Sequence, residues 1–287
     1  MQRQTPPVAL GLTSRRVKLP TGVELHYVEK GDPTGSALIF LHGFADSWRS
    51  WQLNLPLVSD QYHTFALSQR GHGDSEKPEC CYRPDDLAND VIAFMDALNI
   101  RRSTLIGHSM GSFIAYTVAL NQPERLERLV LLGWGPLKPT DEAGAARVME
   151  LHSYLNTLKG SIEPAFVRDF VARTAFNPIP AAYTDTLVIE SLKVPVTVWK
   201  QLVAGRLASV EDTASGQDII KTPTLIMYGD RDPYAREGTS ALTSVIQNQT
   251  VILFPSTGHA LHWEHPQRFV KELQSFLRAP HDTQPSG

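Results

Sequence analysis

The chain has 287 residues, of which 42% are hydrophobic and 20% are charged, and its formal net charge is −3. This composition is typical of a soluble globular protein that can bury a large core, in one domain or in one domain with an insertion. Its 27 lysines and arginines are dispersed, which argues against a nucleic-acid or membrane partner.

The amino-terminal stretch and the two cysteines indicate the cellular compartment to expect. The stretch MQRQTPPVALGLTSRR at residues 1–16 lacks the apolar core of a signal peptide. No segment approaches the roughly 18 apolar residues of a membrane span. We therefore expect a cytoplasmic protein. Cys80 and Cys81 are adjacent, and a disulfide between neighbours closes a strained small ring, so we expect free thiols and no metal site.

The first half of the chain alternates strand-like runs with helical patterns. Helical spacing of apolar residues predicts a helix over 85–100, and a short helical stretch carries Trp48 and Trp51. Uninterrupted apolar runs such as ALIFL, RLVLL and PTLIMYG are what a parallel sheet covered on both faces requires. The fold class is therefore α/β, with strands expected at 15–19, 23–30, 37–43, 63–68, 103–107, 128–132, 223–229 and 251–256.

The alternation stops after RLVLLGWG and resumes with PTLIMYGD. Between them, stretches such as MELHSYLNTL and PAFVRDFVARTAF predict several helices and little strand. We therefore expect a core domain of residues 1–134 and 217–287, with residues 135–216 inserted as a helical segment over the sheet.

A candidate nucleophile lies in the stretch LIGHSMGSF. Ser109 is the centre of a Gly-x-Ser-x-Gly pentapeptide that follows one expected strand and opens the helical pattern MGSFIAYTVAL. Two glycines permit a tight turn, and the amino terminus of the helix directs free N–H groups at the serine. By itself the pentapeptide is weak support, but this context favours a nucleophile.

Candidates for a base and an acid that such a serine would need lie further along the chain. His259 lies in the loop after the last strand, on the same rim of a parallel sheet as Ser109. His262 and His265, near the final helix, are expected to be solvated surface residues. For the acid, spacing alone divides the choice evenly between Asp230 and Asp232, each of which could also be a turn residue.

Taken together, these motifs resemble the α/β-hydrolase family over residues 16–278. The motifs that carry the resemblance are His42-Gly43-Phe44, Arg70-Gly71-His72-Gly73-Asp74-Ser75, the GHSMG turn, GDRD and Gly258-His259. One departure is that Ser68 and Gln69 stand where relatives commonly have an aspartate, which concerns loop architecture. In turns such as these, we expect His42, His72 and His108 to make local hydrogen bonds.

The resemblance implies roles for specific residues. It implies an α/β-hydrolase fold with a helical cap after the sixth strand, and it selects Asp232 over Asp230 as the acid. It also implies an oxyanion hole formed by the backbone N–H groups of Phe44 and Met110. Apolar residues of the cap region are candidate substrate contacts, although any one of them is more often cap core than substrate contact: Trp134, Leu151, Phe166, Phe170, Trp199 and Leu202.

The reaction that this arrangement favours is hydrolysis of a small or medium apolar carboxylic ester or lactone. Related dehalogenases and epoxide hydrolases use aspartate as nucleophile, and Ser109 argues against both. Carbon–carbon bond hydrolysis of ring-fission products is an alternative, because HWEH at 262–265 resembles part of that subfamily. A hydrolase-fold receptor for a small ligand is another.

No cofactor is implied, because the chain has no phosphate-binding glycine motif and no histidine spacing that suits a metal. The expected partner is a small-molecule ester substrate. A homodimer is among the oligomeric states that the sequence allows.

Overall fold

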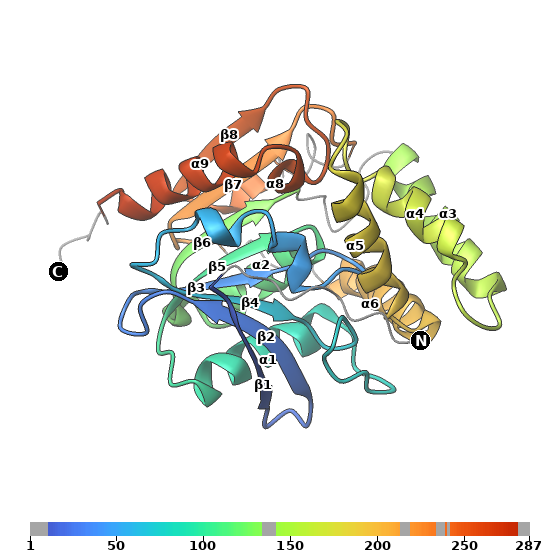
Figure 1. Cartoon of the computed structure of the whole chain (residues 1–287), viewed down its shortest axis with the longest axis horizontal. Coiled ribbons are helices and arrows are strands. Elements are labelled where there is room, and N and C mark those ends of the chain that lie inside the picture. Colours follow the sequence, from blue (N-terminus) through green and yellow to red (C-terminus); the bar gives the residue numbers. More distant parts are fainter. Residues whose placement is uncertain (1–10, 134–141, 213–218, 234–238, 240–241, 281–287) are drawn as a thin grey trace.

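An eight-stranded sheet forms the centre of the molecule in the computed structural model, which describes residues 11–133, 142–212, 219–233, 239 and 242–280 (Figure 1). The strand order is β1-β2-β4-β3-β5-β6-β7-β8. The strands are β1 (Thr13–Lys18), β2 (Glu24–Lys30), β3 (Ala37–Leu41), β4 (His63–Ser68), β5 (Ser103–His108), β6 (Leu126–Leu132), β7 (Thr224–Gly229) and β8 (Gln249–Phe254).

Strands β3 to β8 pair parallel with one another. Strand β2 pairs antiparallel with β4, and β1 pairs antiparallel with β2 at the edge of the sheet. The predicted α/β fold is therefore confirmed. Leu41 pairs with both Leu67 and Gly107, so β3, β4 and β5 end at the same level. The loops that leave the carboxyl ends of these strands consequently meet along one edge, where parallel sheets place their sites.

Two hydrophobic cores cover the two faces of the sheet. Strand β3 is buried throughout, with Ile39 and Leu41 in one core and Leu38 and Phe40 in the other. The first core includes α1 (Pro84–Ala97) and α2 (Met110–Asn121), and the second includes α9 (Pro266–Arg278) and the short turn η1 (Trp48–Trp51). This arrangement explains the uninterrupted apolar runs, since both faces of each central strand are shielded from water.

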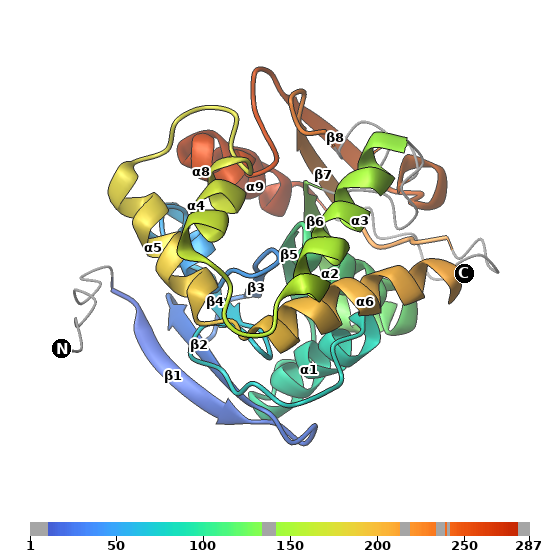
Figure 2. The same ribbon diagram turned by 90° about the vertical axis from the view of Figure 1, so that its right-hand side faces the viewer.

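Among the described residues, four helices lie between β6 and β7 in the chain, and they lie on one side of the sheet (Figure 1 and Figure 2). They are α3 (Glu142–Thr157), α4 (Pro164–Ala172), α5 (Ala181–Leu192) and α6 (Val196–Asp212), with α3 packed on α6 and α4 on α5. The expected boundaries of this segment at residues 135 and 216 lie outside the described residues. Among the described helices, none is long and apolar enough to cross a membrane.

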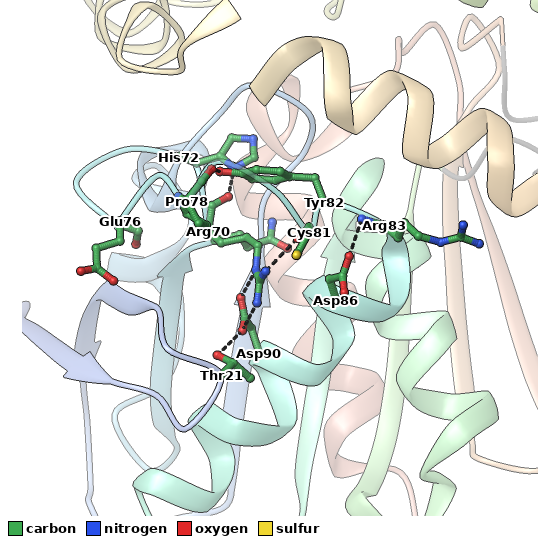
Figure 3. A network of polar contacts seen from close by, with 12 residues as sticks. Thr21, Arg70, His72, Glu76, Pro78, Cys81, Tyr82, Arg83, Asp86 and Asp90 are labelled. Carbon is green, nitrogen blue, oxygen red and sulfur yellow. Dashed lines mark hydrogen bonds and ion pairs between the residues drawn. The ribbon is translucent and has the colours of Figure 1, made fainter. Parts of the chain in front are cut away.

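A loop before α1 contradicts the expectation of free thiols. Cys80 and Cys81 are joined by a disulfide, so that prediction is wrong. Cys81 has a φ of 76°, a left-handed conformation that accommodates the small ring. Its carbonyl oxygen accepts a hydrogen bond of 2.8 Å from Arg70, which also forms a buried ion pair with Asp90 (Figure 3). The turn is therefore anchored to α1 through Arg70.

Candidate active site

Ser109 lies in the sharp turn between β5 and α2. Its φ is 52° and its ψ is −113°, a conformation that non-glycine residues rarely adopt. The backbone N–H of Ser109 donates to the carbonyl oxygen of Leu132, at the end of β6, over 2.9 Å. Its carbonyl oxygen accepts from the N–H of Ser112 over 2.9 Å, which begins the helix. The strained turn is thus held from both sides and leaves Ser109 half-buried.

The two glycines of the pentapeptide are required by close backbone contacts. A Cβ atom at Gly107 would lie 2.3 Å from the carbonyl oxygen of Gly111. A Cβ atom at Gly111 would lie 2.1 Å from the carbonyl oxygen of Leu41 in β3. Any side chain at either position would therefore push α2 away from the sheet. The spacing in the sequence has a steric cause, independent of any role for the serine.

His259 and Asp232 come together at the ends of β7 and β8. His259 Nδ1 and Asp232 Oδ2 are 2.8 Å apart, and the carboxylate side chain of Asp232 is fully buried. Asp230, by contrast, accepts a hydrogen bond of 3.2 Å from the backbone N–H of Thr257. Of the two aspartates that spacing left open, Asp232 therefore contacts the imidazole.

Ser109 and His259 are both placed against the end of β6. Ser109 is hydrogen-bonded to Leu132, and the next residue is Gly133. A Cβ atom at Gly133 would lie 3.0 Å from both Nδ1 and Cε1 of His259. In addition, His108 Nε2 is 3.2 Å from the carbonyl oxygen of His259. The turn of the serine and the loop of the histidine are therefore joined by direct contacts.

The loop after β3 covers Ser109 on its other side. A Cβ atom at Gly43 would lie 3.4 Å from the Cβ of Ser109, so the backbone at this point passes directly over the serine. Phe44 and Met110, whose N–H groups are the expected oxyanion donors, are both half-buried. Met110 is the first residue of α2, where backbone N–H groups have no partner within the helix.

Three of the six candidate substrate contacts form an aromatic cluster with Phe44. The ring of Trp199 is 4.9 Å from that of Phe44, and the ring of Phe170 is 6.0 Å from it. Phe166 contacts both of these rings, at 6.5 Å from Phe170 and 6.4 Å from Trp199. Leu202 is buried in the adjoining core. Leu151 is half-buried against the same core. Trp134 lies outside the described residues.

Two of the other histidines, His108 and His262, differ from the expectation. His42 and His72 make the local hydrogen bonds expected of them, to Gly43 and Arg70. His262 is fully buried, so the prediction of a solvated residue is wrong. Its ring lies 4.3 Å from that of Trp51 and 4.5 Å from that of His108. His108 bonds to the carbonyl oxygen of His259, 151 residues away in the chain, so the expectation of a local hydrogen bond is wrong for His108. Burial lowers the pKa of His108 and His262 well below the usual histidine range.

Sequence reasoning did not single out Glu264, although it organises the loop that carries His259. Its carboxylate accepts hydrogen bonds from the N–H groups of Gly258, Phe176 and Asn177 over 2.8 to 3.0 Å. It also accepts from the side chain of Asn177 over 2.7 Å. Glu264 therefore joins the histidine loop to the segment between α4 and α5. A lone glutamate at the end of a four-residue helix, α8 (Leu261–Glu264), carries no signal of this in the sequence.

Comparisons with known proteins bear on this geometry. A family model described as the alpha/beta hydrolase fold matches residues 36–266, which is most of the chain. The chain belongs to the α/β-hydrolase fold family.

Relatives within this family carry different names. Epoxide hydrolase 3 of Mus musculus is 25% identical, over 96% of this chain and 83% of that protein. The 2-hydroxy-6-oxononadienedioate/2-hydroxy-6-oxononatrienedioate hydrolase of Paraburkholderia xenovorans is 28% identical, over 92% of this chain and 95% of that protein. An esterase of Exiguobacterium antarcticum shares the fold with a TM-score of 0.80 at 20% identity, over 93% of this chain and 100% of its own.

Proposed function

We propose that this α/β hydrolase is a serine hydrolase that cleaves carboxylic esters or lactones with small to medium apolar groups. Its nucleophile is Ser109, its base is His259 and its acid is Asp232. The observation that carries the proposal is the left-handed conformation of Ser109, with a φ of 52°, at the amino terminus of α2. Such a turn exposes a serine hydroxyl beside free backbone N–H groups, and backbone strain of this kind is concentrated at functional sites.

The first half of the reaction forms an acyl-enzyme. His259 accepts the hydroxyl proton of Ser109 while the serine oxygen attacks the ester carbonyl. The carbonyl oxygen becomes an oxyanion, which accepts hydrogen bonds from the N–H groups of Phe44 and Met110. Asp232, 2.8 Å from Nδ1 of His259, stabilises the imidazolium. The imidazolium then gives its proton to the leaving alkoxide, and the alcohol departs.

The second half returns the enzyme to its starting state. A water molecule gives a proton to His259 as its oxygen attacks the acyl-serine carbonyl, and the same two N–H groups bind the new oxyanion. When the bond to Ser109 breaks, the serine oxygen recovers the proton and the carboxylic acid is released. The aromatic cluster of Phe44, Phe166, Phe170 and Trp199 favours an apolar acyl or alcohol group beside the serine.

Epoxide opening fits this site poorly, although some relatives are named epoxide hydrolases. If Ser109 attacked an epoxide carbon, the product would be an alkyl ether. An ether has no carbonyl carbon for water to attack, so the enzyme would remain alkylated. A carboxylate nucleophile avoids this, since it forms an ester that water hydrolyses.

A second candidate is hydrolysis of a carbon–carbon bond next to a ketone. It is favoured by the 28% identity to the hydrolase named for 2-hydroxy-6-oxononadienedioate. A serine, a histidine and an oxyanion hole could serve that reaction as well. The aromatic cluster beside Ser109 suits an uncharged group better than a dicarboxylate.

The test is the initial rate of hydrolysis of p-nitrophenyl esters of increasing acyl length. Wild type is compared with Ser109→Ala and with Ser153→Ala, which replaces an exposed serine on α3. We expect rapid turnover that Ser109→Ala lowers by roughly 10⁴-fold or more and Ser153→Ala leaves unchanged. Negligible turnover by the wild type, or activity that survives Ser109→Ala, would contradict the ester proposal. Turnover of a ring-fission product in place of esters would favour the second candidate.

A further inference from the structure

The peptide group between Gly43 and Phe44 is planar, and it connects the proposed oxyanion hole to the side chain of His42. The peptide between Gly43 and Phe44 contains both the carbonyl of Gly43 and the N–H of Phe44, and these point in opposite directions in a trans peptide. No described peptide bond is cis. Whatever fixes the carbonyl of Gly43 therefore also aims the N–H of Phe44. His42 Nδ1 lies 2.8 Å from that carbonyl oxygen.

The protonation of His42 follows from its other ring nitrogen. The backbone N–H of Gln69 donates to Nε2 of His42 over 3.0 Å, so Nε2 carries the lone pair. The proton of the neutral ring is then on Nδ1, which donates to Gly43. The ring is fully buried, and burial lowers the pKa of His42 well below the usual range, which keeps it neutral.

Gln69 holds His42 a second time through its side chain. Gln69 Nε2 donates to the backbone carbonyl of His42 over 2.9 Å, and the residue is 3% exposed. His42 follows β3 and Gln69 follows β4, and the parallel register of these strands brings the two residues face to face. Gln69 therefore forms hydrogen bonds with both the ring and the backbone of His42. It is one of the two residues, Ser68 and Gln69, at which the chain departs from its relatives.

We propose that Gln69 is a positioning residue for the oxyanion hole. It fixes His42, His42 fixes the carbonyl of Gly43, and the N–H of Phe44 is thereby aimed at the oxygen that becomes charged during attack by Ser109. The inference rests on the proposed serine mechanism. It also gives a reason for glutamine at this position, because an uncharged amide supplies a donor to a buried carbonyl without adding a buried charge.

The test compares Gln69→Met with Gln249→Met. Methionine has the length of glutamine but no hydrogen-bond donor. Gln249 is a matched control, because its Nε2 also donates to a backbone carbonyl, that of Thr243 at 3.0 Å. In both glutamines Oε1 is buried without a hydrogen-bond partner among the described residues. Gln249 begins β8, at the end of that strand opposite the His259 loop.

A misplaced oxyanion donor should slow the reaction without weakening substrate binding. For Gln69→Met we expect kcat to fall about 10-fold, with KM within about twofold of wild type. The inhibition constant of a trifluoromethyl ketone, whose adduct with Ser109 needs the oxyanion hole, should rise by the same factor as kcat falls. Gln249→Met should leave all three values unchanged. If Gln69→Met does not fold, Gln69→Leu is used, with the same expectation, because leucine also lacks a hydrogen-bond donor and adds no charge.

Labelling of Ser109 by a fluorophosphonate separates this proposal from the ester proposal. If wild type is labelled but does not hydrolyse esters, the ester proposal fails, and slower labelling of Gln69→Met still supports a positioning role. A folded Gln69→Met with wild-type kcat, inhibition and labelling rate would overturn that role. So would an equal loss in Gln249→Met. A wild type that is neither labelled nor active would overturn both proposals.

Discussion

At the scale of single residues, Asp230 and Asp232 are two positions apart in the chain, but their side chains have different partners. Asp232 contacts the imidazole of His259, while Asp230 contacts the backbone of Thr257. We expect Asp232→Asn to lower kcat by about 10⁴-fold, because an amide can hold the histidine in the wrong tautomer and cannot stabilise the imidazolium. The measurement is kcat on the best p-nitrophenyl ester.

Asp230→Asn is the matched control for that variant. It makes the same chemical change two residues away, in the same loop, and the new amide oxygen can still accept from Thr257. We expect kcat close to wild type, with the melting temperature of both variants recorded. Equal losses of kcat in the two variants would contradict the assignment of Asp232 as the acid.

The carboxyl group of Asp46, two residues after Phe44, is buried, and we expect it to make stability depend on pH. Burial raises the pKa of Asp46 to about 7, against the hydrogen bonds from Ser50 and Ser47 that favour the carboxylate. The native state therefore holds a proton that the unfolded chain releases near pH 4. The stability that this proton contributes is present below pH 4 and is lost as the pH rises through about 7.

Asp46→Asn should remove this dependence, because the amide stays neutral at every pH. Near pH 4 to 5 we expect wild type and variant to have similar free energies of unfolding. At pH 8 the variant should be more stable, by on the order of 3 kcal/mol. Chemical denaturation at both pH values measures the difference. A gain of the same size at low and high pH would point to a packing effect and contradict the titration.

Residues that sequence reasoning placed wrongly have partners far away in the chain. His262 is buried because its ring packs on Trp51 and His108, and Cys81 is held by Arg70. Nothing in the local pattern around either residue specifies such contacts. Ser109 was identifiable because its requirements are local: two glycines, a strand before it and a helix after it.

At the scale of elements, the strands of the sheet could be predicted because burial on both faces gives uninterrupted apolar runs. Helix α1 was predictable as well, since Leu87, Val91, Phe94 and Met95 form one buried face. The helices between β6 and β7 are a different case. Their existence follows from helical spacing, but an apolar face does not specify its partner, and the pairing of α3 with α6 and α4 with α5 required the structure.

The aromatic contact of α4 and α6 with the loop after β3 predicts acyl-chain preference. Phe170 packs on both Phe44 and Trp199, beside the proposed oxyanion hole. We expect Phe170→Ala to raise KM for hexanoate and octanoate esters about 10-fold and to leave KM for acetate nearly unchanged, because only the longer chains lose apolar contact. The KM values of the ester series measure this.

Phe176→Ala is the control, since it removes a phenylalanine that is 55% exposed in the loop after α4. It should leave the ester series as in wild type. If Phe170→Ala raised KM by the same factor for acetate and octanoate, the ring would not contact the acyl chain, and the proposed pocket would be wrong.

At the scale of the whole molecule, the helices between β6 and β7 are joined to the segments that follow β3, β4 and β8 by polar contacts as well as by the aromatic cluster. Tyr183 of α5 donates to the carbonyl of Ser50 over 2.8 Å, and Lys193 pairs with Asp74 over 2.9 Å. Glu264 adds the bonds from Gly258, Phe176 and Asn177 described above. These links join chain segments that are distant in sequence, so composition and periodicity could not reveal them.

Glu264 bonds to two segments, so loss of its carboxylate should affect both the His259 loop and the segment after α4. In Glu264→Gln, one carboxylate oxygen is replaced by an NH₂ group, which would face N–H donors instead of accepting from them. Hydrogen bonds to a charged group contribute about 1.5–3 kcal/mol each. We expect the melting temperature to fall by roughly 6–12 °C, which corresponds to about 3 kcal/mol in a protein of this size. Glu124→Gln, at an exposed glutamate, should change it little.

Amide hydrogen exchange then distinguishes a link from a local effect. Because the carboxylate holds Gly258 on one side and Phe176 and Asn177 on the other, exchange should accelerate together in residues 256–260 and 174–178 of Glu264→Gln. Faster exchange in the histidine loop alone would mean that the contact with the segment after α4 is incidental. Joint acceleration would mean that the carboxylate of Glu264 couples the loop carrying the proposed base to the segment after α4, so that opening one loosens the other.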